Sequence, residues 1–146
     1  MYPDPDVARY ISNNFVPVRI HIKERPDLFK RFGAEWTPTI LTWDADSNTE
    51  RHRIEGFLPK PELLGQLALA LGHYAYGRQD WDAAIRSFEE AASHQDSEAA
   101  AEGVYWAGVS RYKKTQDPGA LRATGQALNQ KFPQSVWAKK GSVWTG

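Results

Sequence analysis

The chain has 146 residues, of which 25% are charged and 41% hydrophobic, and its 18 basic and 18 acidic side chains give a formal net charge of zero. This balance is typical of a globular protein and excludes a globally disordered chain. Zero net charge indicates neither a nucleic-acid-binding nor a membrane-binding protein, so we expect neither as a partner. Cysteine is absent, which excludes disulfides, thiolate catalysis and zinc–thiolate sites.

No apolar run approaches the roughly 18 residues of a transmembrane helix. The first residues, MYPDPDVARY, lack the basic and apolar regions of a signal peptide, which favours the cytoplasm if Met1 is the natural start.

The first elements are predicted to be a helix and a strand. Asp4 is a suitable N-cap before Pro5, an apolar stripe follows, and Asn13 and Asn14 mark a stop. In the next segment, Phe15 to Ile22, every second residue is apolar: Val16, Val18, Ile20 and Ile22. This alternation predicts a strand with one apolar face, with Pro17 at its start or at an edge of the sheet.

A short helix and a hairpin are predicted next. Pro26 and Asp27 open the helix and Gly33 ends it. The run from Pro38 to Trp43 reads as a strand, the stretch DADSNT as a turn, and Glu50 to Phe57 as the returning strand. Pro59 then starts a long helix.

This order resembles the later two-thirds of a thioredoxin fold over about residues 1–72. The likeness rests on the stretches FVPVRI, RPDLFKRFG, TPTIL and DADSN and on Gly56-Phe57. It implies that Thr37-Pro38 is the cis-proline step of that family and that Trp36, Thr37, Pro38 and Thr39 face a bound peptide. The alternative is that Pro38 only shapes the turn into its strand.

Two parts of the family pattern are absent, namely the central strand and the Cys-x-x-C that follows it. Without that strand, the segments around Val16–Ile22 and Pro38–Trp43 would have a gap between them. Either the two strands pair directly, or another chain supplies a strand. A homodimer through the exposed sheet edge is one expected outcome.

The second half contains a repeat with a period of 36 residues, close to the roughly 34 residues of tetratricopeptide repeats. Gly72 recurs as Gly108, Ala84 as Ala120 and Ala91 as Ala127, and Thr124 stands where the family has Phe. The first copy, with Phe88, resembles that family well. The expected helices are 60–77, 81–94, 97–115, 118–131 and 134–144. Residues 60–146 would form a helical domain that shares helix 60–77 with the first domain in a rigid joint.

The inner face of such repeats commonly binds peptides. By position it would present Leu69, His73, Tyr76, Tyr105, Val109 and Tyr112, with Gln66 and Glu102 beside them. Tyrosine suits binding because it buries area at low entropic cost, but it equally suits packing against the C-terminal helix. Trp137 and Trp144 are expected in the core.

The charges of the second half are segregated. Seven acids and one base lie between Asp80 and Glu102, and seven bases and one acid between Arg111 and Lys140. Such segregation is able to orient a partner or a second copy of the chain, but two solvated helical faces are the simpler explanation.

The sequence gives no independent catalytic or metal site. Asp44, Asp46, Asn48 and Glu55 match positions of a calcium loop, but Thr49 replaces its glycine, and a hairpin turn explains them better. The four histidines have no metal-ligand spacing.

The sequence therefore predicts a partial thioredoxin-like α/β unit of about three strands followed by an all-α tetratricopeptide-like array. The expected function is a non-catalytic binding or adaptor module for a protein or peptide, without a cofactor. Two alternatives remain open: a thiol–disulfide oxidoreductase whose Cys-x-x-C lies just upstream of Tyr2, and a structural oligomerisation unit.

Overall fold

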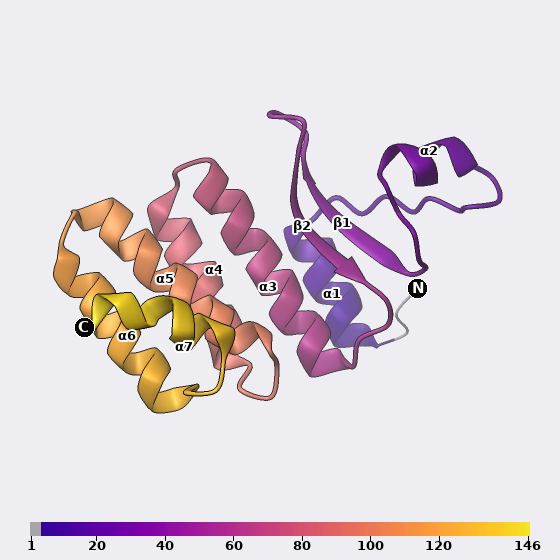
Figure 1. Cartoon of the computed structure of the whole chain (residues 1–146). Helices are drawn as coiled ribbons and strands as arrows, with labels where there is room; N and C mark the ends of the chain where they lie inside the picture. Colours follow the sequence, from indigo (N-terminus) through magenta and orange to yellow (C-terminus); the bar gives the residue numbers. More distant parts are fainter. Residues whose placement is uncertain (1–3) are drawn as a thin grey trace.

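The computed structural model describes residues 4–146 and has a mixed α/β fold (Figure 1). An antiparallel hairpin of β1 (Thr39–Asp44) and β2 (Thr49–Glu55) precedes an array of packed helices. The helices are α1 (Pro5–Asn14), α2 (Pro26–Arg31), α3 (Lys60–Gly77), α4 (Trp81–Ser93), α5 (Ala99–Thr115), α6 (Pro118–Lys131) and α7 (Val136–Gly141), followed by the 3-10 helix η1 (Ser142–Trp144).

Most of the predicted elements are confirmed. The hairpin strands and the four helices between residues 60 and 131 end within two residues of their predicted limits. The last predicted helix, 134–144, is divided into α7 and η1. The predictions about an upstream Cys-x-x-C and the natural start concern positions outside the described residues.

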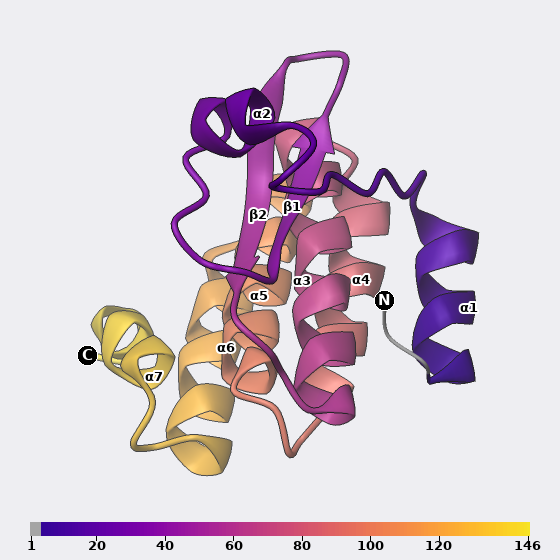
Figure 2. The ribbon, with the colours of Figure 1, turned by 90° about the vertical axis from the view of Figure 1, so that its right-hand side faces the viewer.

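The predicted strand from Phe15 to Ile22 is wrong. The segment pairs with no strand in the described part of the chain, so the sheet there has two strands rather than about three. It leaves α1 on the side of β1 that faces away from β2 and then crosses toward α2 (Figure 2). Alternating apolar residues form a strand only when a neighbouring backbone supplies hydrogen-bond partners, and β1 supplies them to β2 alone within residues 4–146.

The hairpin lies between helices. On one face, the buried Ile54 packs in a cluster with Val7 of α1 and with Leu63 and Leu67 of α3. On the other face, the ring of Trp43 meets the edge of Phe32, just after α2, with ring centroids 5.2 Å apart. Both faces of this short sheet are therefore covered, as its mixed apolar pattern requires.

The N-terminal end of α1 is fixed to α3 by polar contacts. The Asp4 carboxylate accepts from the backbone N–H groups of Asp6 and Val7 and so caps α1, as predicted. Lys60 Nζ lies 3.2 Å from Asp4 Oδ2 and 2.6 Å from Asp6 Oδ2. Phe15, directly after α1, packs against the hairpin core.

Small residues allow the helices of the array to approach closely. A Cβ atom on Gly72 would lie 2.5 Å from the Phe88 ring, and a Cβ atom on Gly108 would overlap the Thr124 side chain. Both pairs are 16 residues apart, so the two halves of the repeat use equivalent positions. Thr124 thus fills, beside Gly108, the place that Phe88 fills beside Gly72.

Candidate functional site

The loop that enters β1 is the first predicted site, and it is exposed. Trp36 has 68% of its surface exposed, and Thr37 and Pro38 are exposed beside it. The Thr37–Pro38 peptide bond is cis, as the resemblance implied. Thr39 Oγ1 donates a hydrogen bond to the Trp36 carbonyl at 2.5 Å, which closes the loop where the strand begins. All four predicted residues therefore lie together at one end of β1.

The position of this loop is fixed by Arg53 of β2. Its guanidinium donates to the carbonyl oxygens of Phe32, at 2.6 Å, and Gly33, at 3.2 Å, and pairs with Glu50 at 2.7 Å. Gly33 adopts a φ of +63°, which glycine tolerates and most residues do not. The chain can therefore turn sharply after α2, so that Trp36 lies near the start of β1.

One long side of β1 has no strand beside it in the described part of the chain. The Gly56 N–H donates to the Pro38 carbonyl at 2.7 Å. Because inward-facing groups alternate along an antiparallel pair, the backbone groups of Ile40 then face β2 and those of Thr39 and Leu41 face away from it. We call this outward side of β1 the β1 edge.

The segment from Phe15 to Ile22 leaves α1 on the same side. Phe15 is anchored at the hairpin core, but Val16 and Val18 have 92% and 80% of their surface exposed. Ile20 and Ile22 are also exposed. A row of exposed β-branched side chains on an extended backbone is a feature that soluble proteins usually cover.

The second predicted site, the inner helical face, is largely filled by the chain itself. Leu69 is completely buried in the core between α3, α4 and α5. Tyr105 stacks on Trp144 and contacts Trp137, with ring centroids 5.0 and 5.1 Å apart. Packing against the C-terminal helix, which the sequence left open as an alternative for the tyrosines, therefore describes Tyr105.

At the other end of this face the hairpin covers His73. Its ring stacks on His52 of β2, with centroids 5.7 Å apart and an interplanar angle of 19°, and its Nε2 atom lies 3.0 Å from Glu102 Oε2. His52 Nε2 in turn lies 2.8 Å from Gln66 Oε1. Burial lowers the pKa of His52, and the neighbouring His73 acts in the same direction, against the hydrogen bond to Gln66.

The middle of the inner face holds the remaining predicted residues. Tyr76 contacts the rings of Trp81 and Trp106 at 5.3 and 5.4 Å, and burial raises its pKa. Val109 and Tyr112 are partly exposed further along α5. Sequence reasoning missed Trp106, which also contacts His73 and whose buried Nε1–H has no partner in the described structure. It also missed His52, since a contact between a strand and a helix leaves no local signal.

Residues 4–146 contain no cluster of metal ligands and no helix that could span a membrane. No cluster of three or more His, Asp or Glu side chains there could hold a metal ion. Asp44, from the calcium-like stretch, instead pairs with Arg51 at 3.2 Å and caps its own turn. Burial alone would raise the pKa of Asp44, but the hydrogen bonds from Ser47 and Arg51 outweigh it and lower that pKa. None of the helices in this range has the length and apolar composition of a membrane span.

The two sites differ in what they can do. The inner face is an aromatic interior with few exposed groups. The β1 edge instead presents outward backbone groups, with the exposed Trp36 before the strand and the exposed apolar segment on the same side. Comparisons of the chain with protein-family models, with curated proteins and with solved structures found no match.

Proposed function

We propose that the chain is a non-catalytic binding module that accepts an extended segment of another polypeptide along the β1 edge. The observation that carries the proposal is that β1 has a strand on one side only, while the apolar segment from Phe15 to Ile22 remains exposed and unpaired in the described structure. An incoming strand would supply partners to Thr39 and Leu41 and cover Val16 and Val18. Strand addition of this kind is a common mode of peptide recognition.

We propose a partial thioredoxin-like unit joined through α3 to a tetratricopeptide-like array. The order of α1, α2, the hairpin and α3 supports the first part, and the equal spacing of the pairs Gly72–Phe88 and Gly108–Thr124 supports the second. Since the chain has no cysteine, this proposal assigns recognition and no thiol chemistry to the loop at Pro38.

The inner helical face is the weaker candidate for a peptide site. Its two ends are covered by His52 of the hairpin and by Trp137 and Trp144 of the C-terminal segment. A peptide there would have to displace these rings. The β1 edge needs no such displacement, so we place the main site there.

Binding of a labelled synthetic peptide in which valine alternates with serine tests the proposal. The double variant Val18→Pro/Ile20→Pro removes two N–H groups from a segment that forms no ladder in the described structure, so its folding should be unchanged while binding is lost. The control Val18→Ala/Ile20→Ala keeps both N–H groups and should retain part of the binding.

Amide hydrogen exchange then locates the peptide. Peptide binding should slow exchange at Leu41, whose N–H faces away from β2. Unchanged exchange at Leu41, together with equal binding by the proline and alanine variants, would contradict the proposal. Loss of binding on Tyr112→Ala instead would place the peptide on the inner helical face.

A further inference from the structure

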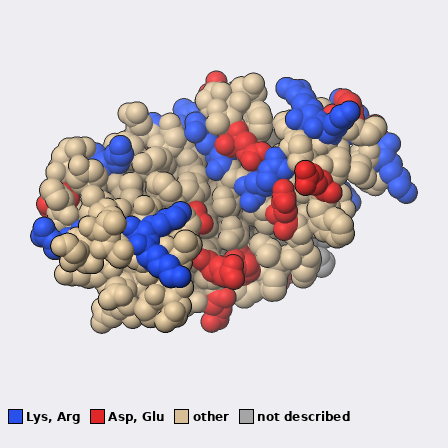
Figure 3. All heavy atoms as spheres, in the orientation of Figure 1, with Lys and Arg blue, Asp and Glu red and all other residues tan. Residues whose placement is uncertain are grey.

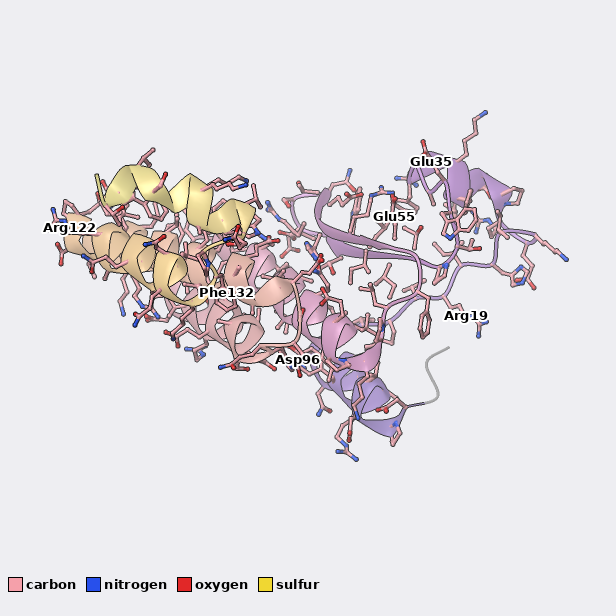
Figure 4. All side chains as sticks on the ribbon, turned by 60° about the horizontal axis from the view of Figure 1, so that its bottom comes forward. Arg19, Glu35, Glu55, Asp96, Arg122 and Phe132 are labelled. Atoms are coloured by element: carbon pink, nitrogen blue, oxygen red, sulfur yellow. The ribbon has the colours of Figure 1, made fainter. Side chains whose placement is uncertain are left out.

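The charge within the exposed segment from Phe15 to Ile22 is positive. Along Phe15–Ile22, the side chains that alternate with the apolar row include Pro17, Arg19 and His21, and no acid occurs among these residues; Lys23 and Glu24 follow in a turn closed by the His21 carbonyl. In Figure 4, Arg19 projects from the segment on the side away from Glu35 and α2. The segment therefore presents an apolar row on one face and a basic row on the other.

The bases around the segment outnumber the acids that remain outside ion pairs. Among residues 4–60, every acid except Glu24 and Glu35 forms an ion pair, for example Asp27 with Arg25 at 2.9 Å. Within the same described range, four bases form none: Arg19, Lys23, Lys30 and Arg31. Figure 3 shows Lys and Arg side chains gathered at the α2 end of the molecule. This end carries unpaired positive charge beside exposed apolar side chains.

We infer that the polypeptide accepted along the β1 edge is an acidic strand, in which apolar residues alternate with Glu or Asp. This inference rests on the proposed function and names the chemistry of its partner. Side chains directly opposite each other on neighbouring strands interact, and opposite charges stabilise the pairing. An incoming strand beside the segment would place its apolar residues against Val16 and Val18 and its carboxylates against Arg19, with Lys23 in the turn that follows.

The same charges argue against a second copy of this chain as the occupant. If the segment paired with itself about a two-fold axis, Arg19 and Lys23 of one copy would face the same bases of the other. Like charges directly opposite each other destabilise a strand pair. The homodimer that the sequence allowed is therefore the less favourable way to cover the segment.

Three labelled peptides test the inference, with valine alternating with glutamate, with lysine or with serine. At low ionic strength the glutamate peptide should bind roughly tenfold more tightly than the lysine peptide, with the serine peptide between them. Added salt should reduce the difference in affinity between the glutamate and lysine peptides. The double variant Arg19→Glu/Lys23→Glu should reverse the preference, whereas Arg122→Glu/Lys139→Glu, with the same change of net charge at distant exposed positions, should leave it unchanged.

The outcomes separate this inference from the proposed function. If all three peptides bind equally and the variant Val18→Pro/Ile20→Pro binds none of them, the strand-accepting function is supported. The inference that the partner is acidic is then wrong. Binding of none by a chain that sediments as a monomer would overturn both. Binding of none by a chain that sediments as a dimer, with the dimer lost in the proline variant, would make a second copy the occupant and also overturn the acidic partner.

Discussion

Two imidazole rings meet where the hairpin packs on the helical array. His52 comes from β2 and His73 from α3, and each has a polar partner, Gln66 for the first and Glu102 for the second. The ring centroids are 5.7 Å apart, and burial together with the neighbouring His73 lowers the pKa of His52. Glu50 and Glu102 are the charged groups that favour the protonated form of His52, but burial outweighs them.

His52 should make the stability of the protein depend on pH. Its pKa in the folded chain is lowered by burial relative to the unfolded value of about 6.5, so the unfolded chain binds the proton more readily. The contribution of His52 is complete above that unfolded value and is lost as the pH falls through the folded pKa. Denaturant titrations between about pH 8 and about pH 5 should show this loss.

The variant His52→Gln isolates the effect, because glutamine can keep a hydrogen bond to Gln66 without titrating. Its free energy of unfolding should fall less between the two pH values than that of the unchanged chain. His21→Gln, at an exposed position outside the cluster, should retain the full pH dependence. Identical pH dependence in all three proteins would contradict the prediction.

The acidic side chains of α4 form ion pairs with basic side chains of α5. Arg111 of α5 pairs with Glu89 of α4, and Lys114 pairs with Asp82 at 2.5 Å. Charges that are separated in the sequence thus meet across two neighbouring helices. Because all four side chains are exposed, such pairs contribute little stability and are screened by salt. Close packing, rather than these ion pairs, holds the two helices together.

Gly103 sets how closely α4 and α5 approach. A Cβ atom there would lie 2.5 Å from the Phe88 carbonyl oxygen and 2.7 Å from the Ala92 nitrogen, both of them backbone atoms that cannot rotate away. We expect Gly103→Ala to lower the free energy of unfolding by about 1–3 kcal/mol, although alanine favours helix. Denaturant unfolding measures this. Gly119→Ala, whose new atom would meet only the Asp117 side chain, should cost much less, and equal losses would contradict the explanation.

The C-terminal segment closes the far end of the molecule. Ala138 of α7 packs with Leu128 and Ala101, and Trp137 lies between Tyr105 and the Lys140 side chain, whose Nζ atom is 4.2 Å from the Trp137 ring centroid. The hairpin covers the inner face of the array at the opposite end. The helical array therefore has a different cap at each end, which short arrays of helix pairs need for stability.

Removal of the Trp137 ring should destabilise the whole chain. Trp137→Ala deletes contacts with Tyr105 and Trp106, and we expect a loss of roughly 2–3 kcal/mol in the free energy of unfolding, less than for a fully buried tryptophan. Thermal or denaturant unfolding should show one cooperative transition at lower stability. Val143→Ala, at an exposed site of η1, should change the free energy by no more than about 0.5 kcal/mol. A similar small change in Trp137→Ala would mean that α7 does not cap the array.

The sequence by itself determined the elements whose signals are local. Capping by Asp4, the turn after Asp44 and the proline starts of α3 and α6 all act within one or two turns of chain. The Thr37–Pro38 step beside Trp36 and the absence of cysteine can likewise be read from the sequence. These features depend on neighbouring residues or on composition, so they can be read without coordinates.

Only the tertiary structure decided which partners the elements find. The alternation from Phe15 to Ile22 satisfies the pattern of a strand, yet a strand also requires a second backbone, and none lies beside this segment in residues 4–146. Likewise, Leu69 and Tyr105 share the predicted inner face, but the core buries the first and Trp144 covers the second. Hydrogen-bond pairing and burial join residues far apart in the chain, and a local pattern cannot specify them.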